Sequence, residues 1–140
     1  TEETDEQGAE DPFRQLRSAV ARPSDTPVVP RWAPSGTEAV IDIVQEAMSD
    51  GTRISVAYQC DNGRFNFVIY FYDIPLKEAA IYQKNDDTVT EYSVNNIDHY
   101  IMNNNGRYGV SWTNGNAECS IQGDLTLNDL KKMVDSIYEE

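Results

Sequence analysis

The 140-residue sequence predicts an α+β domain: a curved antiparallel β-sheet of about six to seven strands with a C-terminal helix packed on its apolar face. Two stretches of alternating apolar and polar residues each enclose an Asn-Gly pair, Asn62-Gly63 and Asn114-Gly115. Asn-Gly is a preferred central pair of a two-residue hairpin turn. The chain then ends in a segment with apolar residues at helical spacing, which completes the predicted fold class.

The first predicted hairpin is "RISVAYQCDNGRFNFVIYFY", residues 53–72. A type I′ turn centred on Asn62-Gly63 pairs Tyr58 with Phe67 and Val56 with Ile69. A slip of one residue would move every side chain to the other face, so the apolar pattern favours one set of faces. The predicted core face holds Ile54, Val56, Tyr58, Cys60, Phe65, Phe67, Ile69 and Phe71.

The second predicted hairpin contains "GVSWTNGNAECSI", residues 109–121. A turn centred on Asn114-Gly115 places Trp112 opposite Ala117 and Val110 opposite Cys119. The predicted core face holds Tyr108, Val110, Trp112, Ala117, Cys119 and Ile121. The Asn and Gly residues of this stretch then belong to the turn and to the solvent face.

Shorter segments supply the remaining strands. The candidates are 80–83, 87–94 and 98–102, with a turn at 103–107 and a loop at 73–77, where Pro75 disfavours a strand. Residues 37–48 are ambiguous from the residues alone. A capping box from Ser35 to Glu38 favours a helix there, whereas the dense β-branched residues favour a strand.

The C-terminal segment is the clearest helix. Thr126 is a good N-cap, with Asp129 three residues later in a variant capping box, and Leu125 and Leu130 can form a hydrophobic staple. The predicted apolar stripe consists of Leu127, Leu130, Met133, Val134 and Ile137.

The N-terminal part differs in composition. Residues 1–28 are predicted to be a disordered or linker segment with a short helix at 12–21, where Asp11 is the N-cap and Pro12 the first helical residue. Residues 29–140 form the single α+β domain, and Trp32 is expected to anchor the Pro-rich connector to the sheet.

The charge excludes some partners. The formal net charge is -13, and the acidic excess is spread along the whole chain. Such a surface repels phosphate backbones and anionic headgroups, so no nucleic-acid partner is expected. No apolar run approaches the ~20 residues of a membrane span, so a membrane is expected only through a segment absent from this chain.

Candidate reactive groups are few. Cys60 and Cys119 both fall on core faces, and two alternatives stay open: buried free thiols, or a disulfide. His99 is the only histidine, and nothing in the sequence places it beside either cysteine. Metal ligands, a cofactor motif and an acid–base pair of carboxylates are also missing, so we expect neither a metal nor a cofactor, and no enzyme activity.

Tyrosine is unusually abundant, with eight residues in the chain. Tyr70 and Tyr72 fall opposite the core face of the first hairpin. Exposed tyrosines suit recognition, so these two are the candidate residues for a ligand or partner. The alternative is that a loop or another strand covers them.

Three motifs occur in an ordered series: "WAPSG" (32–36), "VAYQCDNGRFNF" (56–67) and "GVSWTNGNAECSIQGDLTLNDLKKMVDSI" (109–137). The series resembles a domain of unknown function common in Gram-positive bacteria, often the outer C-terminal part of membrane-anchored proteins, some with an anti-sigma module inside the cell. Cys119 departs from the family pattern, in which an aromatic residue is more usual. The resemblance implies a strand at 37–47.

The resemblance also implies a function: a non-catalytic, extracytoplasmic sensing or protein-interaction domain of a membrane-anchored regulator, located at the cell surface. Without an anchor the protein would be secreted. A second function class is a carrier or binder of an apolar small molecule or lipid, held in a cavity between sheet and helix. Saturable binding of an apolar ligand would distinguish the carrier from the sensor.

Overall fold

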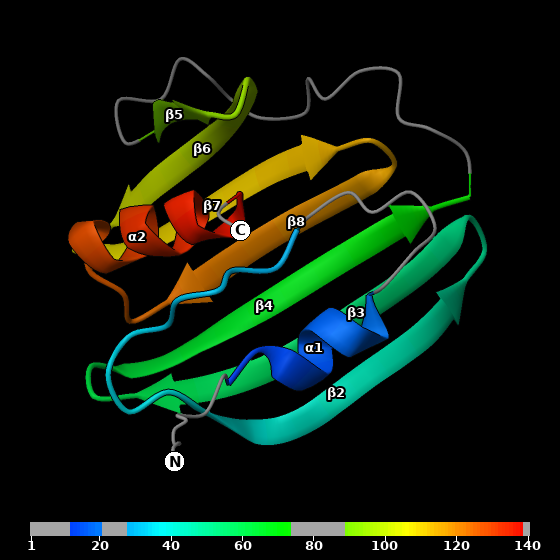
Figure 1. Cartoon of the computed structure of the whole chain (residues 1–140), viewed down its shortest axis with the longest axis horizontal. Coiled ribbons are helices and arrows are strands. Elements are labelled where there is room, and N and C mark those ends of the chain that lie inside the picture. Colours follow the sequence, from blue (N-terminus) through cyan, green and yellow to red (C-terminus); the bar gives the residue numbers. More distant parts are fainter. Residues whose placement is uncertain (1–11, 21–27, 74–88, 139–140) are drawn as a thin grey trace, which may run out of the picture.

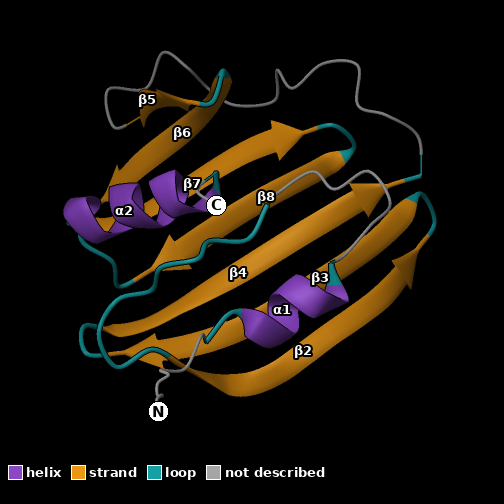
Figure 2. Cartoon of the chain, in the orientation of Figure 1, coloured by secondary structure: helices purple, strands orange, loops and turns teal. Residues whose placement is uncertain are grey.

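The computed structural model describes residues 12–20, 28–73 and 89–138. Within these residues seven antiparallel strands form one curved sheet in the order β2-β3-β4-β8-β7-β6-β5, and two helices lie on one of its faces (Figures 1 and 2). The predicted α+β fold class is therefore confirmed. The elements are α1 (Arg14–Ala19), β2 (Glu38–Met48), β3 (Gly51–Cys60), β4 (Gly63–Tyr72), β5 (Val89–Val94), β6 (Ile97–Asn104), β7 (Arg107–Asn114), β8 (Ala117–Gly123) and α2 (Leu127–Ile137).

The first hairpin forms, but its predicted register is wrong. Tyr58 pairs with Phe65 and Val56 with Phe67, so the turn residues are Asp61 and Asn62 rather than Asn62-Gly63. Each partner is displaced by two residues, which leaves every side chain on its predicted face. A tertiary contact requires glycine at the start of β4, because the neighbouring loop brings the Asp124 carboxylate against Gly63, where a side chain would collide with it.

The second hairpin shows the same displacement. Trp112 pairs with Cys119, not with Ala117, and the turn residues are Gly115 and Asn116. Gly115 has a φ of 64° while Asn116 has no positive φ, the pattern of a type II′ turn with glycine first. The turn also fastens the end of β4, since the Asn116 side-chain amide donates to the Tyr72 carbonyl at 2.7 Å.

Type I′ geometry occurs at two other turns. Asn95 and Asn96 both have positive φ between β5 and β6, as do Asn105 and Gly106 between β6 and β7. The second of these lies in the predicted turn 103–107. The sequence thus predicted strong turn residues correctly, but it assigned the I′ type to the wrong pairs.

The ambiguous segment 37–48 is a strand, β2, as the family resemblance implies. Strands β5 and β6 lie within or extend the candidates 87–94 and 98–102. The candidate strand 80–83 and most of the predicted loop at 73–77 lie outside the described residues.

Helix α2 begins as predicted. The Thr126 hydroxyl accepts from the Asp129 backbone N–H at 3.1 Å, and Leu125 and Leu130 are both buried. Four of the predicted stripe residues are buried: Leu130, Met133, Val134 and Ile137. Leu127, the first residue of the helix, is 36% exposed, contrary to the prediction.

Helix α1 is shorter than the predicted 12–21 segment, and it belongs to the core. Phe13 and Leu16 are almost fully buried, and the Phe13 ring packs edge-on against Tyr58 with a centroid distance of 5.0 Å. The expected N-cap, Asp11, lies outside the described residues, and Phe13 occupies the N-cap position without a side-chain cap. The hydrophobic core therefore begins well before residue 29.

Residues 28–37, the described part of the connector, run over the sheet between the two helices (Figure 1). The Ser136 hydroxyl on α2 accepts from the backbone N–H groups of Arg31 and Trp32 at 2.9 and 3.1 Å. Lys132 places its ammonium over the Trp32 ring at 5.2 Å. Trp32 therefore anchors the connector to α2 and packs against the hydrophobic core.

These elements fill the space on the helix-bearing face. Trp112, Phe67, Ile54 and Ile69 have no exposed surface, and Phe67 packs edge-on against Trp112. At roughly 1.5–3 kcal/mol for each large apolar side chain, this layer dominates the stability. The opposite face of the sheet carries neither described helix, and we call it the open face.

Candidate functional site

A continuous cross-strand row lies at the centre of the open face. The registers link one residue on each of six neighbouring strands, and the row runs from β2 to β6. Its central members, Asn66 and Gln122, have exposed side-chain amides, while Ala57 and Gly109 contribute almost no side chain. The row consists of Ile41, Ala57, Asn66, Gln122, Gly109 and Met102.

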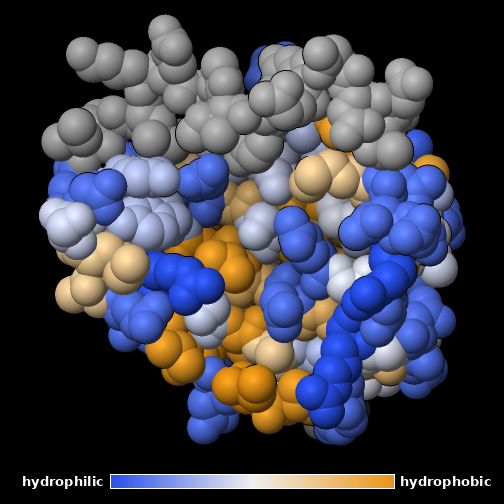
Figure 3. Space-filling view, turned by 180° about the vertical axis from the view of Figure 1, so that it is seen from behind, coloured by the Kyte–Doolittle hydropathy of each residue, from blue (hydrophilic) through white to orange (hydrophobic). Residues whose placement is uncertain are grey.

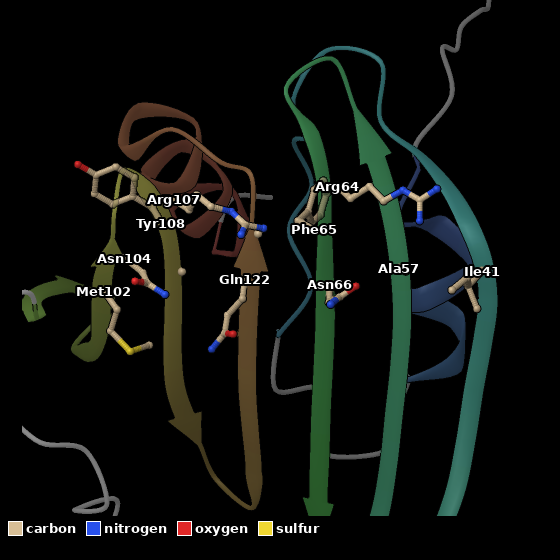
Figure 4. Close-up of a pocket in the computed structure, with 12 residues that line it drawn as sticks. Ile41, Ala57, Arg64, Phe65, Asn66, Met102, Asn104, Arg107, Tyr108 and Gln122 are labelled. Carbon is tan, nitrogen blue, oxygen red and sulfur yellow. The ribbon is translucent and has the colours of Figure 1, made fainter.

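This row forms the floor of a hollow of about 500 Å³. The missing side chain at Gly109 helps to make the room, because a Cβ there would lie 2.8 Å from Gln122 Cγ. Figure 4 shows Ile41 at the β2 end and Met102 at the β6 end, with the two amides between them. The volume lies in the range of ligand pockets in proteins, and the apolar ends with a polar middle suit an elongated ligand.

Apolar surface continues beyond the hollow. Ile41, Val44 and Met48 on β2 are 55%, 43% and 43% exposed. Their partners in the register place all three on the open face. Figure 3 shows this face, with apolar surface across its middle and its lower part between polar side chains.

Two arginines line one side of the hollow. The Arg107 Nε donates to Asp124 Oδ1 at 2.7 Å, and the Arg64 backbone N–H donates to Asp124 Oδ2 at 3.1 Å. The bond from the Arg64 N–H, together with the Arg107 charge, lowers the pKa of the Asp124 carboxyl. Asp124 thus neutralises Arg107, whereas the Arg64 guanidinium makes no ion pair with any residue in the described ranges. In Figure 4 the Arg64 side chain leaves β4 and reaches across β3 toward Ile41.

The predicted recognition residues Tyr70 and Tyr72 lie elsewhere on the open face. Their ring centroids are 4.5 Å apart, and both hydroxyls donate to carboxylates, Tyr70 to Asp50 and Tyr72 to Glu118. These hydrogen bonds raise the pKa of each tyrosine to about 12. Tyr70 is four residues along β4 from Asn66, roughly 13 Å away, so the pair is not part of the hollow.

The two cysteines are free thiols. Cys119 is buried and Cys60 is partly exposed. Their partners on β4, Ile69 and Gly63, lie six residues apart, which separates the cysteines by roughly 20 Å along the strands. A disulfide needs Cα atoms within about 7 Å, so the fold does not bring these two together.

His99 is fully buried under the end of α2. Its Nε2 lies 2.8 Å from the Tyr138 hydroxyl, and its Nδ1 lies 3.1 Å from the Tyr92 carbonyl. Burial lowers the pKa of His99, although the hydrogen bond to Tyr92 acts in the opposite direction. The histidine therefore has a structural position, away from both cysteines and from the hollow.

The described residues contain no group of three or more His, Cys, Asp or Glu that could hold a metal ion. Among them no helix is both long and apolar enough to cross a membrane. What the open face offers chemically is hydrogen bonding, the Arg64 cation and apolar contact. This set of groups is suited to binding.

Arg64, Asn66 and Ala57 are absent from the predicted core face of the first hairpin, so alternation puts them on the other face, but the sequence does not identify the hollow. The pairing of β4 with β8 brings Gln122 beside Asn66, and these residues are 56 positions apart in the sequence. The one available signal was the small residue at Ala57 and at Gly109, each in the middle of a strand, which indicates space over a sheet.

The architecture and the hollow define an α+β domain with an antiparallel sheet that is covered by helices on one face and hollowed on the other. A family model described as "Domain of unknown function (DUF4367)" matches residues 27–137, and the chain belongs to this family. No curated protein and no solved structure gave a match. The resemblance seen in the three sequence motifs is confirmed as far as membership of a domain of unknown function.

Proposed function

We propose that this domain is a non-catalytic sensing or protein-interaction module that binds its partner through the open face of the sheet. The hollow over Asn66 and Gln122 is the observation that carries the proposal. It combines apolar ends with polar groups that make no hydrogen bond to any described residue, the composition expected of a binding site.

The groups that a thiol or acid–base enzyme would need are placed for other roles. Cys119 is buried, and burial raises the pKa of its thiol, which disfavours the reactive thiolate. His99 is buried against the hydroxyl of Tyr138, and neither residue lines the hollow. Both observations support a binding role.

The family resemblance extends the proposal to cellular context. We assign the domain to the extracytoplasmic side of a membrane-anchored regulator in Gram-positive bacteria, where binding at the open face would signal the presence of a partner. This step rests on the family resemblance, because a fold alone does not specify a function.

The carrier function has less support. It requires space between sheet and helices, and the described residues there are tightly packed, with Phe13, Trp112 and Met133 all fully buried. The hollow lies on the opposite face, with an amide-rich floor that does not suit a purely apolar ligand.

Photo-crosslinking in the source cells tests the proposal and can capture a partner of any identity. A benzophenone amino acid replaces Ser55, which lies on the open face beside the hollow, or Ser18, which is exposed on α1, in the full-length protein. We expect a discrete adduct from position 55 and none from position 18. The same adducts from both positions, or none from position 55, would contradict the proposal.

A further inference from the structure

The two arginines beside the hollow differ in whether their guanidinium group pairs with the Asp124 carboxylate. Arg107 is bound to the Asp124 carboxylate, and Arg64 contacts that carboxylate only through its backbone N–H. The Arg64 guanidinium extends from β4 over β3 in the direction of the β2 end of the hollow. A planar guanidinium matches a carboxylate in two parallel hydrogen bonds, so this group selects for an anionic acceptor.

The floor of the hollow favours a second feature of the ligand, namely polar groups that can both donate and accept hydrogen bonds. The exposed side-chain amides of Asn66 and Gln122 make no hydrogen bond to any described residue, and Asn104 adds a third amide to the lining. Each primary amide offers both donors and an acceptor, the same set that a peptide backbone presents. The amides can therefore bind an extended backbone without reading its sequence.

The dimensions agree with a short peptide. The row from Ile41 to Met102 crosses five inter-strand spacings, or roughly 24 Å at about 4.8 Å each. An extended chain of about seven residues has this length. The apolar ends of the row would then contact side chains near the two ends of the peptide.

We infer that the hollow binds an extended peptide segment of a partner protein that carries one side-chain carboxylate, held by Arg64. The inference rests on the proposed function and specifies its ligand. The protein's net charge of -13 opposes an anionic ligand at long range, but at physiological ionic strength this effect is screened beyond about 8 Å. Two carboxylates near Arg64 also oppose an anionic ligand: Asp124, which accepts from the Arg64 backbone N–H, and Glu38, which accepts from Gln59, the cross-strand partner of Arg64.

Two peptide pools test the inference by fluorescence anisotropy. Both contain labelled seven-residue peptides with capped ends, a leucine near each end and random Ser, Thr and Asn between. One pool has Glu at the centre and the other has Gln. We expect the Glu pool to bind about three- to tenfold more tightly, and the difference to shrink as salt is added.

Two substitutions test which residues cause the difference in affinity between the two peptide pools. Arg64→Gln should remove the preference for Glu, so that the variant binds the two pools with equal affinity. Glu38→Gln should strengthen binding of the Glu pool, because a competing negative charge is lost. Both residues are exposed, so both variants are expected to fold.

Each other outcome is decisive. Equal binding of the two pools by the native protein overturns the carboxylate assignment and leaves the proposed function standing. No binding of either pool up to about 1 mM overturns the peptide assignment, while the cross-linking result still decides the proposed function. Binding of inorganic phosphate with an affinity equal to that of the Glu pool would also overturn it, since it would show a simple anion site.

Discussion

At the scale of single residues, the different exposure of the two cysteine side chains predicts different reactivity of their thiols. Cys119 has 1% of its surface exposed beneath the helices, and Cys60 is partly exposed at the end of β3. In the native protein a thiol reagent should therefore modify Cys60 at least tenfold faster than Cys119, because the buried thiol reacts only through opening of the structure. Mass spectrometry of the labelled peptides gives both rates, and equal rates would contradict the packing described for β8.

The buried histidine predicts a pH dependence of stability. Burial lowers the pKa of folded His99 below the ordinary value of 6.5, so the unfolded chain takes up a proton first as the pH falls. The stabilising contribution is complete above pH 6.5 and is lost as the pH falls toward the folded pKa. Urea unfolding at about pH 7.5 and about pH 5.5 should thus show lower stability at the lower pH.

The control for this effect is His99→Asn, which retains a polar group and does not titrate. The difference in free energy of unfolding between the two pH values should shrink in the variant. Asp98 and Asp135 lie near the ring, and both favour the protonated form. An unchanged pH dependence would show that the loss of stability comes from other groups.

At the scale of elements, α1 is the largest departure from the sequence interpretation. Its apolar residues suggested only a marginal helix in a linker, because an isolated helix of that length is not stable. The structure gives Phe13 three aromatic neighbours: Tyr58, Phe65 and Phe67. A helix of this kind is stabilised by its tertiary contacts, which the local sequence does not record.

Phe13→Ala therefore tests whether α1 belongs to the core. We expect a loss of about 3–5 kcal/mol in the free energy of unfolding, since a fully buried aromatic side chain is removed. Gln15→Ala, on the exposed side of the same helix, should change stability by less than about 0.5 kcal/mol. A loss below about 1 kcal/mol for Phe13→Ala would indicate a linker after all.

Ser136 joins the connector to α2 and gives a second prediction for an element. Its hydroxyl accepts from two backbone N–H groups and donates to the Met133 carbonyl at 2.8 Å. Ser136→Ala should cost roughly 1–3 kcal/mol in thermal or urea unfolding, because two donors lose their acceptor. Ser18→Ala, exposed on α1, is the matched control, and similar small effects from both changes would contradict the role of Ser136.

The strands were more predictable than the helices and their turns. Alternation identified which residues of β3, β4, β7 and β8 face the core, and these assignments hold. The registers were wrong by two residues because turn preference alone set them. In the folded protein, Gly63 lies against Asp124, and Asn116 binds the end of β4, and both partners come from distant parts of the chain.

For the whole molecule, the two faces of the sheet have different roles. Both helices and the described part of the connector cover one face and fill it with apolar side chains, so the proposed binding site lies on the other face. The sequence indicated the open face through Tyr70 and Tyr72, but it did not indicate the hollow, whose members come from six strands. Such a site depends on strand order, which local patterns do not determine.

The exposed edge of the sheet is protected against uncontrolled pairing. Strand β2 carries Glu38, Asp42 and Glu46, and its pairing with β3 is irregular at two places. Charges and bulges of this kind discourage association through an edge strand. The long β2 strand can thus expose apolar residues on the open face without acting as a template for aggregation.

The central claim is that ligands bind in the hollow of the open face. Amide NMR spectra of the domain, titrated with the Glu peptide pool, test it most directly. The account predicts shifts at Ala57, Asn66 and Gln122 that disappear when Ala57→Phe fills the hollow and persist in Ser55→Phe, two residues away on the same face. Shifts that cluster on α1 and α2, or that survive Ala57→Phe unchanged, would contradict it.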